Sequence, residues 1–81
     1  MSPERSLASY AAACLSLAFQ ALDRGISLRD ATCTLCEDGL TVLLEVPVGD
    51  DESIGASFQL PNRVYEENFD ARPYLAGFQD D

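Results

Sequence analysis

Apolar residues in the first part of the chain recur at spacings of three and four, which is the period of an α-helix. Ser2 and Pro3 are typical of a helix start, and Gly25 is typical of a helix end. We therefore expect a helix over residues 3–24. Its predicted apolar face consists of Leu7, Tyr10, Ala11, Cys14, Ala18, Ala21 and Leu22, widened by Leu15 and Phe19.

Six alanines in this helix allow it to approach a neighbouring element closely. That neighbour is either the sheet of the same chain or a second copy of the helix. We interpret the apolar face mainly as part of the intramolecular core, and a homodimer interface is the alternative.

After Gly25 the apolar residues alternate with a period of two, which predicts β-strands. The expected strands are residues 31–36, 40–46 and 54–60. Glu37-Asp38-Gly39 is typical of a hairpin turn between the first two strands. Residues 49–52 form an exposed acidic loop, and Pro47 and Pro61 end the second and third strands.

The last twenty residues carry weaker signals. Asn62 is a candidate cap for a short helix over residues 63–70 that ends before Pro73. Residues 74–81 are expected to be coil, held to the body by Leu75 and Phe78. The predicted fold is one α+β domain spanning residues 1–81: an N-terminal helix packed on a three-stranded antiparallel sheet (α-β-β-β), with a short C-terminal helix.

The residue types that are absent exclude most enzyme classes. The chain has no His, Lys or Trp, so it lacks the commonest general base and the lysine nucleophile. Cys33 and Cys36 form a C-x2-C pair, but residues three apart on a strand point to opposite faces, which disfavours a metal or redox site. Cys14 and Cys33 both fall on inward faces and are expected to stay free thiols in a reducing compartment.

Two runs of carboxylates, residues 50–52 and 66–67, also do not match a calcium-binding or a glycosidase site. The first lacks the alternating acids and the downstream Glu of a calcium-binding loop, and a chain of 81 residues leaves no room for a sugar cleft. We therefore expect a protein that is not an enzyme and has no metal or cofactor.

The charge is concentrated in the second half of the chain. Residues 1–36 contain three acids and three arginines, whereas residues 37–81 contain eleven acids and two arginines, and the net charge is −9. A surface this acidic disfavours direct binding of nucleic acid or an anionic membrane. The apolar stretch over residues 7–22 is too short to span a membrane, so we expect a cytoplasmic protein.

A concentrated negative surface attracts proteins that have a basic groove. We therefore expect an inhibitor that blocks a nucleic-acid-binding protein by mimicking nucleic acid. It is similar in size and charge to phage-encoded DNA mimics and anti-CRISPR proteins, although no sequence motif carries the likeness. The candidate partner-binding residues are Asp50, Asp51, Glu52, Glu66, Glu67 and Asp70, with Tyr65 as an aromatic anchor. Phe69 and Tyr74 are further aromatic candidates, and the alternative is that these aromatic residues close the small core.

Two other interpretations remain open. The chain is alternatively an acidic adaptor, chaperone or small subunit that binds a partner through the apolar face of the first helix. A third interpretation is that the acidity serves only solubility or reflects a salt-rich host. Salt distinguishes the nucleic-acid mimic from the adaptor, because salt weakens electrostatic binding and leaves apolar binding intact.

Overall fold

The computed structural model describes residues 3–79 of the chain, and residues 1–2, which include the expected helix cap Ser2, and residues 80–81 lie outside this range. Helix α1 (Pro3–Arg24) is followed by strands β1 (Thr32–Leu35), β2 (Thr41–Pro47) and β3 (Ser53–Gln59). A 3₁₀ turn η1 (Glu66–Asn68) and helix α2 (Arg72–Gln79) complete the chain. The predicted α+β fold, with an N-terminal helix, three antiparallel strands and a short C-terminal helix, is confirmed.

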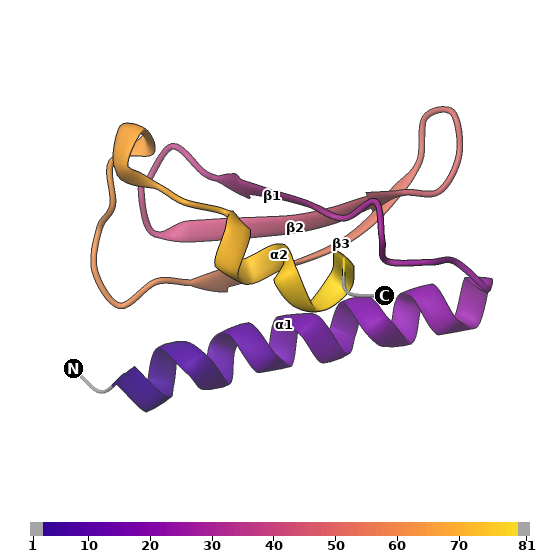
Figure 1. The fold of residues 1–81 in the computed structure, drawn as a ribbon, viewed down its shortest axis with the longest axis horizontal. Coiled ribbons are helices and arrows are strands. Elements are labelled where there is room, and N and C mark those ends of the chain that lie inside the picture. The colour runs from indigo at the N-terminus through magenta and orange to yellow at the C-terminus, as the bar shows by residue number, and fades with distance from the viewer. Residues whose placement is uncertain (1–2, 80–81) are drawn as a thin grey trace.

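The three strands form one antiparallel sheet in the order β1-β2-β3. Leu44 in the central strand pairs with Cys33 on one side and with Ala56 on the other. Both helices cover the same face of this sheet, with α1 mainly across β3 and α2 beside it near β1 (Figure 1). Residues on the other face are mostly polar, including Thr34 and Ser57.

The hairpin turn between β1 and β2 follows from its sequence. Gly39 has a φ of 73°, a conformation that L side chains rarely adopt. The Asp38 carboxylate accepts hydrogen bonds from the backbone N–H groups of Leu40 and Thr41, both at 2.9 Å. These bonds hold the turn where the predicted Asp-Gly pair lies.

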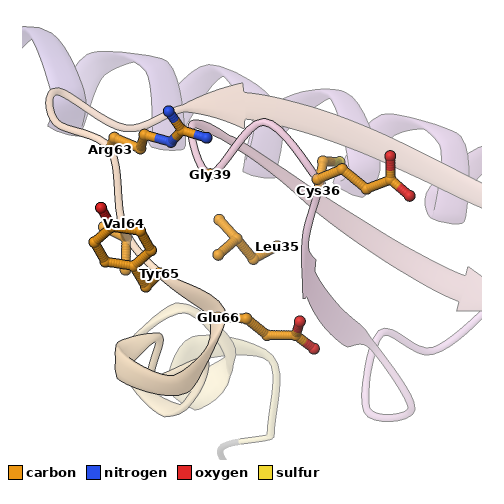
Figure 2. Close-up of a pocket in the computed structure, with 8 residues that line it drawn as sticks. Leu35, Cys36, Gly39, Arg63, Val64, Tyr65 and Glu66 are labelled. Carbon is orange, nitrogen blue, oxygen red and sulfur yellow. The ribbon is translucent and has the colours of Figure 1, made fainter.

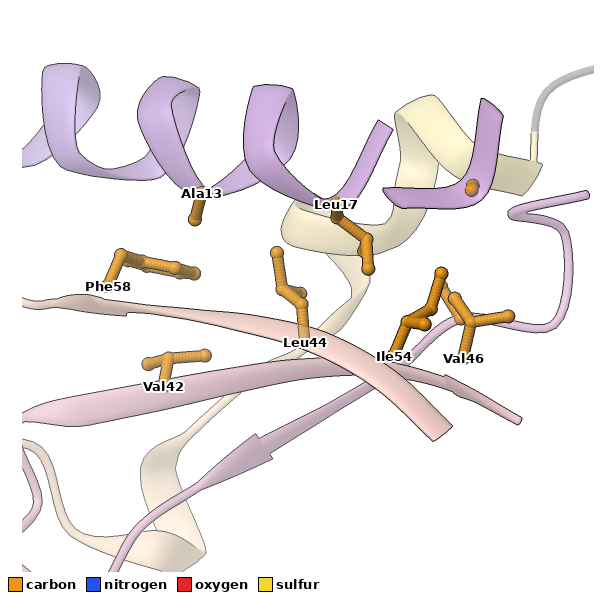
Figure 3. Packing of buried hydrophobic residues seen from close by; sticks show 9 residues of the cluster. Ala13, Leu17, Val42, Leu44, Val46, Ile54 and Phe58 are labelled. Atoms are coloured by element: carbon orange, nitrogen blue, oxygen red, sulfur yellow. The ribbon is translucent and has the colours of Figure 1, made fainter. Parts of the chain in front are cut away.

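The core lies between α1 and the sheet (Figure 3). Leu17 is fully buried, with a relative exposure of 0%, and the smaller Ala13 and Ala21 flank it one turn away on each side. The sheet contributes alternate residues of β2 and β3, as a period of two requires. The nine buried apolar residues are Ala13, Leu17, Ala21, Ala31, Val42, Leu44, Val46, Ile54 and Phe58.

An aromatic cluster fills the space between the two helices and β3. The rings of Tyr10 and Phe58 lie 5.2 Å apart, and Tyr74 of α2 lies 5.4 Å from Tyr10. The Tyr10 hydroxyl donates a hydrogen bond to the Tyr74 carbonyl oxygen at 2.7 Å. Phe69 stacks on Tyr74 at 6.0 Å. These contacts fix α2 against α1, and Phe69 and Tyr74 are partly buried against the core.

The predicted apolar face of α1 is partly wrong. Tyr10, Cys14 and Ala21 face the sheet as expected, but Leu17, which the prediction omitted, is the largest fully buried side chain of the helix. The amide of Gln20 donates to the Gly55 carbonyl oxygen at 2.9 Å, a bond that helps to set the rotation of α1 on the sheet. The five predicted residues that are exposed instead are Ala11, Leu15, Ala18, Phe19 and Leu22. The side chain of Leu7 is not among those the structure describes.

The predicted C-terminal elements are also wrong in extent. The helix expected over 63–70 is only the 3₁₀ turn Glu66–Asn68, because the Val64 N–H donates to the Gly39 carbonyl oxygen at 2.8 Å and keeps that segment extended. The region expected to be coil from residue 74 is helix α2 up to Gln79. Pro73 occupies the first turn of α2, where a missing N–H costs nothing, and so does not break the helix.

Candidate protein-binding surfaces

The β1–β2 turn and η1 lie at the same end of the sheet (Figure 1), and we call the four acidic residues of these two segments the acidic end: Glu37, Asp38, Glu66 and Glu67. Two backbone hydrogen bonds bring the segment after β3 to this turn, from the Leu60 N–H to the Leu40 carbonyl oxygen at 2.7 Å and from Val64 to Gly39. As a result η1 lies beside the turn, although almost thirty residues separate them in sequence (Figure 1).

A small pocket of about 150 Å³ lies within the acidic end (Figure 2). Leu35 lies at its centre, Glu37 and Glu66 contribute carboxylates to its lining, and Arg63 and Tyr65 come from the extended segment before η1. Pockets that hold small-molecule ligands generally have volumes of about 300–1,000 Å³. The dimensions therefore suit a single side chain of a partner better than a substrate or cofactor.

Tyr65 is the one predicted aromatic anchor that is exposed, with a relative exposure of 65%. Beside it, Glu66 and Glu67 are exposed and form no ion pair with any other residue in the range 3–79. Their charges are therefore available to a partner. An exposed tyrosine next to unpaired carboxylates combines an apolar contact with charge, as protein interfaces do.

The other predicted partner-binding acids are not part of the acidic end. Asp50, Asp51 and Glu52 lie in the loop between β2 and β3, at the opposite end of the sheet (Figure 1). Glu52 lies 3.9 Å from the Arg24 guanidinium at the end of α1. The structure therefore separates the predicted acids into two groups rather than joining them on one surface.

Asp70 is partly neutralised within its own chain. The Arg72 side chain donates two hydrogen bonds of 2.9 Å to the two oxygens of its carboxylate, and the Arg72 backbone N–H donates a third. The side-chain bond is the main reason that the pKa of Asp70 lies below its ordinary value. Asp70 and Arg72 thus stabilise the turn before α2, and Asp70 is a weaker candidate for partner binding than Glu66 or Glu67.

A second surface that the sequence analysis did not separate lies on α1, opposite the core. We call it the outer face of α1. Leu15, Phe19 and Leu22 have relative exposures of 61%, 68% and 79%. All members recur at helical spacings of three and four, so they form one stripe along the helix: Ala8, Ala11, Ala12, Leu15, Ala18, Phe19 and Leu22. The signal was present in the sequence, because α1 carries two apolar stripes that the prediction merged into one.

The three cysteines are free and half-buried. Burial raises the pKa of the Cys33 thiol to about 11. Burial is also the main reason that the pKa of Tyr10 is raised to about 12, and Cys14 and Cys33 nearby add to the effect. Within residues 3–79, no group of three or more His, Cys, Asp or Glu side chains is arranged to hold a metal ion.

No protein-family model matches the chain, and neither a curated protein nor a solved structure is detectably similar to it. Neither α1 nor α2 has the length and apolar character that a membrane-spanning helix needs, as far as the described residues extend.

Proposed function

We propose that this chain is a non-enzymatic protein-binding domain that inhibits a nucleic-acid-binding protein. In this proposal the acidic end enters the partner's basic groove, with Tyr65 as the apolar anchor, in the cytoplasm. The observation that carries it is that exposed Tyr65 adjoins the unpaired Glu66 and Glu67 in sequence and lines the same pocket as Glu37 and Glu66. Negative charges of this kind speed and orient association with a basic surface.

The two separated acid groups allow a sharp test of this proposal. One variant combines Glu37→Gln, Glu66→Gln and Glu67→Gln at the acidic end. The matched control combines Asp50→Asn, Asp51→Asn and Glu52→Gln, which removes the same number of charges from the opposite end. Each protein is used to capture partners from a host lysate at low salt and at about 0.5 M salt, where the Debye length is only about 4 Å.

We expect the unmodified chain to capture a nucleic-acid-binding protein that added DNA or RNA displaces. Capture should be lost at high salt and in the acidic-end variant but should persist in the matched control. Equal losses in both variants would mean that total charge, rather than the acidic end, governs binding. Capture that survives in the acidic-end variant contradicts the proposal.

The outer face of α1 favours a second candidate function, that of an adaptor or small subunit that binds a protein through apolar contacts. Three large apolar side chains on this face are mostly exposed, and exposed apolar patches of this kind mark interaction sites. Binding of this type would persist at high salt and would be lost when Phe19 is replaced by a charged residue. The same capture experiment therefore distinguishes the two functions.

A further inference from the structure

We propose that the outer face of α1 is a homodimer interface, in which two copies of this chain pack α1 against α1 in antiparallel orientation. The inference goes beyond the function of the acidic end and does not depend on it. The adaptor function described above uses the same face of α1. Here we propose that a second copy of the chain, rather than a different protein, covers it.

The distribution of charge makes this face suitable for self-association. The chain carries a net charge of −9, yet residues 6–22 contain no charged side chain. Two copies that approach through the acidic end or through the 50–52 loop bring like charges together, which is unfavourable. Approach through the middle of α1 places only apolar and uncharged residues in contact.

The sizes of the side chains favour an antiparallel pair. The N-terminal half of the outer face contains only alanines, whereas Phe19 and Leu22 lie in its C-terminal half. In an antiparallel pair centred on Leu15, Phe19 of one copy lies opposite Ala11 of the other, and Leu22 lies opposite Ala8. Large side chains then meet small ones along the whole contact, as close packing requires. A parallel pair would place Phe19 against Phe19 and leave a gap between the alanines.

The area of the face is sufficient for a weak dimer. The exposed parts of Leu15, Phe19 and Leu22, together with the four alanines, amount to about 500 Å² per copy and about 1,000 Å² in total. This total is near the lower limit for a specific protein interface. We therefore expect a dissociation constant in the micromolar range.

The first test is the mass of the protein in solution, measured by sedimentation equilibrium from about 1 µM to about 1 mM, a range that brackets a micromolar dissociation constant. We expect the mass to rise from 8.8 kDa toward twice that value. Salt should strengthen the dimer, because it screens the repulsion between two acidic chains. A protein that remains monomeric at the highest concentration at both low and high salt would overturn the proposal.

The interface is tested with Leu15→Glu, which places two carboxylates together on the twofold axis. Its matched control is Thr34→Glu, which makes the same change in net charge at an exposed position of β1, on the face of the sheet away from α1. We expect Leu15→Glu to weaken the dimer by about 100-fold or more and the control to leave it unchanged within about threefold. Circular dichroism verifies that both variants stay folded. A dimer that tolerates Leu15→Glu, or that both variants weaken equally, would contradict the assignment of this face.

The orientation is tested by exchanging a large and a small residue. Ala11→Phe alone should weaken an antiparallel dimer, because the new ring meets Phe19 of the partner. Adding Phe19→Ala in the same chain should restore the affinity to within about tenfold, since each large residue again faces a small one. If Ala11→Phe strengthens the dimer instead, the helices pair in parallel and the antiparallel arrangement is wrong.

Discussion

Two leucines on α1, only two residues apart, are expected to lose very different amounts of stability when each is replaced by alanine. Leu17 is fully buried between α1 and the sheet, whereas Leu15 has a relative exposure of 61% on the outer face. Leu17→Ala leaves a cavity whose neighbours on the helix, Ala13 and Ala21, are too small to fill it. We therefore expect a loss of about 3 to 4 kcal/mol in the free energy of unfolding.

That loss is large for a chain of this length, whose free energy of unfolding is about 4 to 12 kcal/mol. Leu15→Ala should cost less than about 1 kcal/mol, because little of its surface is buried and alanine favours the helix. The assay is urea unfolding followed by circular dichroism, at a protein concentration low enough to keep the chain monomeric. A loss of less than about 1 kcal/mol for Leu17→Ala, or an equal loss for both variants, would refute the assigned orientation of α1.

Three further predictions concern other parts of the fold. Gly39→Ala should lower the free energy of unfolding, measured by thermal unfolding, by about 2 kcal/mol or more, because φ is positive and the new Cβ would lie 2.8 Å from a backbone oxygen. In the same assay Gly77→Ala in α2, whose new Cβ meets nothing within 4 Å, should stabilise the chain by about 0.5 kcal/mol. Cys33, with a pKa of about 11 against an ordinary 9.0, should react with iodoacetamide about 100-fold more slowly in the folded chain than in urea, as peptide mass spectrometry can measure. Tyr10→Phe removes the 2.7 Å hydrogen bond to the Tyr74 carbonyl oxygen and should lower the free energy of unfolding by about 1 kcal/mol. Backbone amides of α2 should then exchange hydrogen faster, and unchanged exchange would mean that this bond does not hold α2 in place.

The elements that were predicted well from the sequence are those whose ends or apolar periodicity are marked by nearby residues. Helix α1 has the predicted bounds because Pro3 fits the first helical position and Gly25, with a φ of 66°, ends the last turn. The three strands follow because alternate residues of β2, from Val42 to Val46, are buried and the residues between them are not. In these places one local pattern allows only one structure.

The errors arose where the local pattern allows two structures. Helix α1 has apolar side chains on opposite sides, so its sequence does not show whether Leu15 or Leu17 faces the sheet. Pro73 both ends helices and begins them, and only the packing of Tyr74 against Tyr10 shows that a helix begins here. The position of Glu66 and Glu67 beside the β1–β2 turn was also hidden, because it follows from the long-range backbone hydrogen bonds of Leu60 to Leu40 and of Val64 to Gly39 and not from any local pattern.

The proposed dimer would reunite the acids that the monomer separates. The N-terminus of α1 lies at the same end of the molecule as η1, and its C-terminus lies beside the loop that contains Asp50 and Asp51 (Figure 1). Antiparallel packing of two α1 helices then places the acidic end of one copy and the 50–52 loop of the other at each end of the dimer. A partner held by the acidic end of one copy would gain an additional contact with the 50–52 loop of the other copy, because one binding event holds the second group nearby. Leu15→Glu would then lower the affinity for the partner without abolishing its capture, although it leaves both acid groups intact.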